Sequence, residues 1–99
     1  MAGAMTVKSV EAIVEELPQA TSLNFCDRPI DIEIIQKIAA LKHLQHLDIS
    51  NCQLDDTHAV VIMQLKGLKT LNLSANKFSE RMIAALKKHP NFKETHLLF

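Results

Sequence analysis

The organisation of the chain is decided by two stretches that match position by position, LKHLQHLDISNCQL at residues 41–54 and LKGLKTLNLSANKF at residues 65–78. Their apolar residues recur at an offset of 24 positions. The same offset aligns seven mostly apolar columns between about Val10 and Leu97, and we expect no insertion in that span. A fixed period of this length is typical of folds that stack copies of one small structural unit.

Each unit has a helical half and a strand half. In the second unit, Ile34, Ile35, Ile38 and Leu41 form the stripe of a short amphipathic helix. The alternation at 47–49, apolar-polar-apolar, predicts a short strand with one buried face. Further helix signals are the candidate N-caps Asp31, Asp55 or Asp56, and Ser79, and an earlier apolar stripe at Val7, Val10, Val14 and Leu17.

The two quoted stretches resemble leucine-rich repeats, because both fit the signature L-x-x-L-x-L-x-x-N/C-x-L. Cys52 and Asn76 stand at its N/C position. The resemblance implies that the Asn76 amide is buried and binds the backbone of a turn, and that Cys52 fills the same slot. The first unit is degenerate, with Arg28 at this position, and the last unit, from Phe92, is truncated. Atypical end units are expected because they cap a stack.

The resemblance implies an α/β fold. This fold is a short right-handed leucine-rich-repeat solenoid with a parallel β-sheet on the concave face and short helices on the convex face. The length of 99 residues suits one domain and not two. We expect residues 1–99 to form a single domain of four units, at approximately 7–30, 31–54, 55–78 and 79–99.

The outward positions of the expected strands carry polar side chains. At the 24-residue offset Glu94 falls beside Thr70, and His96 falls beside Asn72. A rigid concave sheet of this kind is a typical recognition surface. We therefore expect a non-catalytic protein-binding module, an adaptor, scaffold or inhibitor-like protein, with partner-binding residues Asn24, His46, Asp48, Ser50, Thr70, Asn72, Ser74, Glu94 and His96.

The last expected strand ends in the apolar residues Leu97, Leu98 and Phe99, and the 24-residue offset places Leu98 beside Ser74. An uncovered apolar strand edge can pair with another chain. We therefore expect a second possible interface here, either in a homodimer or with another subunit.

Composition argues against several other classes of protein. The chain has 11 Lys+Arg and 11 Asp+Glu, so its formal net charge is zero and nothing favours nucleic-acid binding. No apolar run approaches the roughly 20 residues of a membrane span, and the start lacks the features of a signal peptide. Two cysteines are too few for a disulfide framework, which favours a reducing, cytoplasmic setting.

The residues that could carry chemistry do not converge in the expected fold. His43 and His46 straddle a helix-to-strand turn, and Cys26 should point outward where Cys52 points inward. Neither a metal site nor a disulfide fits these directions. A gently curved sheet also offers no water-excluding pocket for a nucleophile. We expect no catalysis, no metal and no cofactor.

A weaker resemblance leads to an alternative function. The stretch LDISNCQLDDT at residues 47–57 resembles the core of STAS domains of the anti-sigma-factor-antagonist type, which implies a regulatory phosphorylation site at Thr57. A phosphate at a helix N-terminus gains from the helix dipole. However, the span from Thr57 to Thr70 leaves room for a helix of only about three turns, and that family does not demand seven aligned columns.

Overall fold

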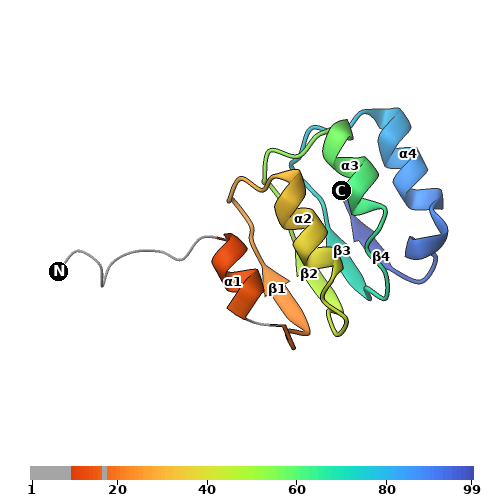
Figure 1. Cartoon of the computed structure of the whole chain (residues 1–99). Coiled ribbons are helices and arrows are strands. Elements are labelled where there is room, and N and C mark those ends of the chain that lie inside the picture. Colours follow the sequence, from red (N-terminus) through yellow and green to blue (C-terminus); the bar gives the residue numbers. More distant parts are fainter. Residues whose placement is uncertain (1–9, 17) are drawn as a thin grey trace.

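Short helices alternate with short strands in a computed structural model that describes residues 10–16 and 18–99 (Figure 1). The elements are α1 (Val10–Glu16), β1 (Ser22–Asn24), α2 (Ile32–Ala39), β2 (His46–Asp48), α3 (Asp56–Ile62), β3 (Thr70–Asn72), α4 (Glu80–Lys88), the 3-10 helix η2 (Pro90–Phe92) and β4 (His96–Leu98). Val7 and Leu17 of the first expected stripe lie outside the described residues.

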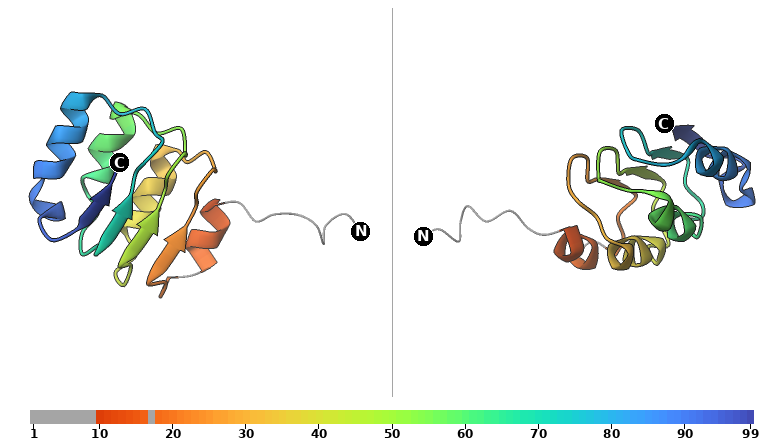
Figure 2. Two further views of the ribbon diagram at one scale, coloured as in Figure 1. Left: turned by 180° about the vertical axis from the view of Figure 1, so that it is seen from behind. Right: turned by 90° about the horizontal axis from the view of Figure 1, so that it is seen from above.

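The four strands form one sheet in the sequential order β1-β2-β3-β4, and every neighbouring pair is parallel. The helices cover one side of this sheet, so that the strands line the inner side of an arc and the helices its outer side (Figure 2). This sequential, parallel arrangement confirms the α/β solenoid that the repeat predicts, with a concave sheet face and a convex helix face.

The helices begin at the expected capping residues. Asp31 caps α2 and Ser79 caps α4, each by accepting the backbone N–H of the residue three positions later. At α3 the cap is Asp55. Asp56 instead accepts the backbone N–H of Ser79 at 2.8 Å, which ties the start of α3 to the start of α4.

The cap of α3 includes a histidine. Asp55 Oδ1 accepts the Thr57 hydroxyl at 2.6 Å and lies 2.9 Å from His58 Nδ1, which in turn lies 3.2 Å from the Asp55 backbone nitrogen. The hydrogen bonds from Thr57 and then from His58 lower the pKa of Asp55 from 3.8 to about 2. The carboxylate form of Asp55 is therefore stabilised by folding.

This cap should make stability depend on pH in acid. Because the pKa of Asp55 is lower in the folded state, its contribution is complete above about pH 4 and is lost as the pH falls towards 2. Asp55→Asn keeps a capping side chain that cannot ionise. We expect its free energy of unfolding, measured by urea titration, to fall less steeply between these pH values than that of the wild type. Equal slopes would contradict the assignment.

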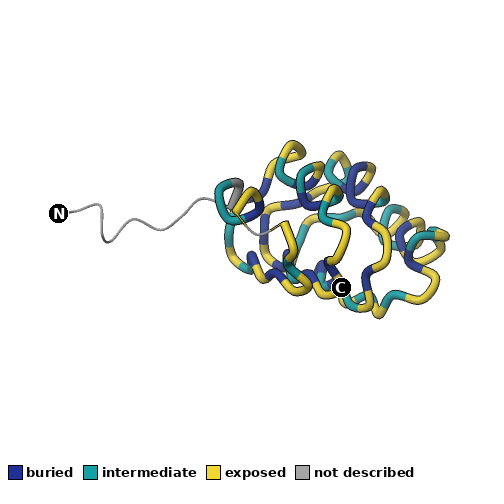
Figure 3. The backbone as a smooth tube through the Cα atoms, turned by 60° about the horizontal axis from the view of Figure 1, so that its bottom comes forward, coloured by how far each residue is buried: buried dark blue, intermediate teal, exposed yellow. Residues whose placement is uncertain are grey.

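The space between sheet and helices is filled by one continuous apolar core. Figure 3 shows buried segments distributed along the whole arc. Burying a large aliphatic side chain contributes roughly 1.5–3 kcal/mol. The most deeply buried aliphatic side chains are Ile35, Ile38, Ile49, Leu54, Ile62, Leu71, Leu73 and Leu86.

Asn76 binds the backbone of a turn, as the resemblance implies, although its side chain is half-buried rather than buried, and it also joins its own unit to the preceding one. Its Oδ1 accepts the backbone N–H groups of Cys52 and Leu54 at 2.9 and 3.0 Å. Its Nδ2 donates to the carbonyl oxygens of Ile49 and Leu73 at 2.9 and 3.0 Å. Backbone groups that the strands leave unpaired are satisfied by this one amide.

Cys52 fills the equivalent slot one unit earlier. Its thiol lies 3.0 Å from the Phe25 carbonyl oxygen and 3.3 Å from that of Ser50. Burial raises the pKa of the Cys52 thiol, which therefore keeps the proton that it donates.

The fourth unit departs from the 24-residue period. The period holds as far as Phe92, which is buried like Leu44 and Leu68, but β4 begins four residues after Phe92, whereas β2 and β3 begin two residues after Leu44 and Leu68. β4 pairs His96 with Thr70 and Leu98 with Asn72, at an offset of 26. The prediction of an uninterrupted period is wrong for this unit. Because the shift is even, inward and outward positions are preserved, and Leu97 still packs against the core.

Candidate functional site

A hollow of about 300 Å³ lies on the concave face of the sheet, which the helices leave open. Strand register aligns its outward side chains into two rows. The histidine row comprises Ser22, His46, Thr70 and His96. The Asx row comprises Asn24, Asp48, Asn72 and Leu98. The hollow is lined by both rows except His96, together with the backbone neighbours Leu23 and Leu47.

The first three members of the Asx row are held in fixed orientations. The Oδ1 atoms of Asn24, Asp48 and Asn72 each accept the backbone N–H two residues later, at 2.9, 2.9 and 3.0 Å. Asx turns of this kind set the direction in which the chain leaves a strand. The row is therefore preorganised, and a ligand would not have to order it.

Asp48 places a negative charge near the centre of the hollow. Its Oδ1 also accepts the Ser50 hydroxyl at 2.6 Å, whereas its Oδ2 has one long contact, 3.5 Å from Asn72 Nδ2. Among the described residues that line the hollow there is no lysine or arginine. His46 Nδ1 lies 2.9 Å from Thr70 Oγ1, so this pair is oriented as well.

Two residues predicted to bind a partner support the Asx row instead. Ser50 is only 7% exposed, and its hydroxyl lies 2.6 Å from Asp48 Oδ1 and 3.2 Å from Cys26 Sγ. The Ser74 hydroxyl donates to Asn72 Oδ1 at 2.7 Å. Both hydroxyl groups reinforce the turns that follow the strands.

The two-residue shift of β4 changes the predicted rows at their end. Glu94 precedes β4 and lies outside the sheet, so its predicted place beside Thr70 is wrong. His96 takes that place, rather than the predicted one beside Asn72. No proline or glycine stands between Phe92 and His96 that could have marked the two extra positions in the sequence.

The three residues of the predicted edge interface have three different surroundings. Leu97 packs against the core, whereas Leu98 lies beside Asn72, lines the hollow and is 42% exposed. The Phe99 ring packs edge-on against Phe78 at 6.4 Å, and Lys87 Nζ lies 5.6 Å from its centroid. Sequence reasoning assigned Leu98 to the edge and missed its place in the hollow, because the last unit is longer than 24 residues.

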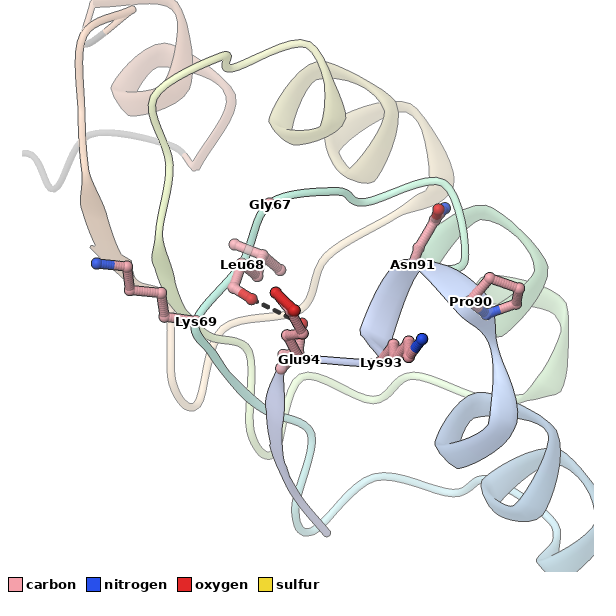
Figure 4. Close-up of a pocket in the computed structure, with 8 residues that line it drawn as sticks. Gly67, Leu68, Lys69, Pro90, Asn91, Lys93 and Glu94 are labelled. Carbon is pink, nitrogen blue, oxygen red and sulfur yellow. Dashed lines mark hydrogen bonds between the residues drawn. The ribbon is translucent and has the colours of Figure 1, made fainter.

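A second hollow of about 390 Å³ lies at the end of the sheet where the strands begin, between the loops before β3 and β4. Its charged side chains do not converge, since Lys69 and Lys93 extend in different directions and Glu94 lies between them (Figure 4). This arrangement forms no common binding point for one charged group.

The cysteines and Thr57, the remaining candidates for chemistry or modification, lie outside the concave hollow. Cys26 is half-buried and Cys52 is fully buried, in accordance with their predicted directions. Thr57 lies exposed in the first turn of α3, with its hydroxyl bound to Asp55. Over residues 10–16 and 18–99, no three His, Cys, Asp or Glu side chains are grouped to hold a metal ion. In the same part of the chain, no helix has the length and apolar character to cross a membrane.

Comparison with known proteins agrees with this architecture. The family model described as Leucine Rich Repeat matches residues 43–65 and 67–89. The chain thus contains leucine-rich repeats, and its fold is a short leucine-rich-repeat solenoid. No curated protein matches the sequence.

Solved structures show the same fold, and one of them is a Caenorhabditis elegans protein described as a tropomodulin C-terminal domain. It aligns with a TM-score of 0.73 and 17% sequence identity. The alignment covers 92% of this chain and 63% of the nematode chain, so this chain spans less than two thirds of that structure. At this identity the likeness establishes the fold alone.

Proposed function

We propose that this chain is a non-catalytic module that binds a protein partner through its concave face. The observation that supports this function most strongly is the hollow on the concave face, whose side chains come from all four strands and include three Asx residues oriented by hydrogen bonds. Leucine-rich-repeat domains generally mediate protein–protein interaction, and solenoids do so through extended concave surfaces. A module that binds a protein partner and catalyses no reaction would act as an adaptor, a scaffold or an inhibitor-like protein.

The contact residues in this proposal differ from those expected from the sequence. His46, Asp48, Thr70 and Asn72 remain central, and Leu98 joins them as an exposed apolar contact. Asn24 and His96 lie at the ends of the two rows. Ser50 and Ser74 act through the turns that they support, and Glu94 is left out.

The proposal also includes the domain organisation of the chain and the cellular compartment in which it acts. Residues 1–99 act as one domain, in which the four units contribute one strand each to the binding face. The free thiols of Cys26 and Cys52 suit a reducing compartment such as the cytoplasm. A contact through the edge at Leu97–Phe99, with a second copy or another subunit, stays a separate prediction.

Capture from a cell extract tests the concave face. Thr70→Arg would fill the hollow with a long cation, and we expect it to reduce capture of the specific partner at least tenfold, a typical effect of disrupting an interface centre. Val60→Arg, which adds the same charge on the 60% exposed position of α3, is the matched control and should leave capture unchanged. Quantitative mass spectrometry compares the two. Equal recovery with both variants would contradict a concave binding site.

Phosphorylation at Thr57 is less well supported as a function. The Thr57 hydroxyl is held by the Asp55 carboxylate at 2.6 Å, and Asp56 adjoins it. A phosphate would stand next to these two carboxylates and be repelled by them. The described residues offer no specific observation that favours a phosphorylation switch over the concave binding face.

A further inference from the structure

We propose that the concave hollow recognises a basic side chain of the partner at Asp48, together with an apolar side chain at Leu98. This inference rests on the proposed function and specifies the chemistry of the partner. It predicts an extended partner segment in which one residue separates an arginine or lysine from an aliphatic residue.

The charge of Asp48 is the first step of the argument. An ionised carboxylate offers about four acceptor sites. Oδ1 is occupied by the Ser50 N–H and hydroxyl, whereas Oδ2 has only the 3.5 Å contact with Asn72. Oδ2 therefore retains capacity for a strong donor. A guanidinium or ammonium group suits it best, because hydrogen bonds between ionised groups are the strongest of this kind.

The lining of the hollow selects against other partners. The described lining contains no lysine or arginine that could offset the charge of Asp48. An acidic partner side chain would be repelled by Asp48, and a purely apolar one would cover Oδ2 without offering it a strong donor, which is costly. A basic side chain is the complement that satisfies this charge.

Leu98 supplies the second contact. Its side chain is 42% exposed and lies in the same row as Asp48, with β3 between them. Two strand spacings separate the two backbones by roughly 10 Å. In an extended segment, residues two positions apart lie on one side at about 7 Å, and the length of an arginine side chain spans the remaining distance.

A titration followed by amide NMR tests the inference on the whole chain. The probe is the peptide acetyl-Arg-Gly-Leu-amide, and the neutral probe acetyl-citrulline-Gly-Leu-amide has the same shape without the charge. We expect saturable shifts confined to the hollow for the arginine probe, and about tenfold weaker binding of the citrulline probe, the typical loss of one charge-assisted hydrogen bond.

Asp48→Asn is the decisive variant. Asparagine occupies the same position of β1 and β3 and makes the same Asx turn there, so the fold should be retained. We expect about tenfold weaker binding of the arginine probe. Glu94→Gln, which removes the same charge outside the hollow, is the matched control and should have no effect.

Three results would overturn the inference: no saturable shifts in the hollow with the arginine probe, equal binding of the two probes, or unchanged binding by Asp48→Asn. Its failure can be separated from that of the proposed function with the captured partner. Suppose that Thr70→Arg abolishes capture but Asp48→Asn leaves the dissociation constant of that partner unchanged. The concave face would then be supported as the binding site, and recognition of a basic side chain by Asp48 would be contradicted.

Discussion

Replacing Asn76 with alanine is expected to destabilise the protein by about 3–4 kcal/mol, close to the upper end for single substitutions. The amide of Asn76 makes five contacts of hydrogen-bonding length to the backbone of its own unit and the preceding one, all at 3.3 Å or less. Alanine would remove the partner of the Cys52 and Leu54 N–H groups and of the Ile49 and Leu73 carbonyl oxygens, which are partly shielded from water. Urea unfolding followed by circular dichroism measures the loss.

Two further variants make this prediction specific. Asn76→Cys should fall between wild type and Asn76→Ala, because Cys52 shows that a thiol in this slot donates to turn carbonyls. A thiol cannot replace the carbonyl oxygen that accepts two N–H groups. Gln64→Ala removes an exposed amide and should change stability by less than about 0.5 kcal/mol. A loss for Asn76→Ala as small as this would show that the slot does not hold the units together.

The fold could be predicted because the same pattern of core residues occurs in several successive units. Ile38, Ile62 and Leu86 are buried at equivalent positions of α2, α3 and α4, as the aligned columns require. The same pattern in the second and third units identified the core positions, so the weaker match of the first unit did not prevent the prediction of the fold. The two extra residues between Phe92 and β4 could not be predicted in this way, because no second copy of the final unit exists to reveal them.

The candidate site was predictable as a surface but not in its details. Alternation showed which residues point away from the core, and it correctly placed His46, Asp48 and Thr70 on the concave face. It could not show that Ser50 turns back to bind Asp48, since a short hydroxyl side chain can face solvent or its own backbone. The triplets at 48–50 and 72–74, an Asx residue two positions before a serine, were the available signal for this local bonding.

Replacing Leu71 with alanine should cost about 3–4 kcal/mol, from lost burial and from the cavity that remains. Leu71 is fully buried in β3, with β2 on one side and β4 on the other. In a solenoid each unit is stabilised mainly by its neighbours, so this substitution weakens two contacts between units. That loss is a large part of the 5–15 kcal/mol typical of a domain.

Leu97→Ala provides the comparison, because Leu97 faces the same core from β4, is only half-buried and has one paired strand beside it. We expect about half the cost of Leu71→Ala. Amide exchange adds a second measurement: Leu97→Ala should weaken protection in β4 and leave β1 and β2 unaffected, whereas Leu71→Ala should weaken it on both sides of β3. Equal costs and equal exchange patterns would mean that the chain unfolds as one indivisible core, and that stability does not pass from unit to unit along the sheet.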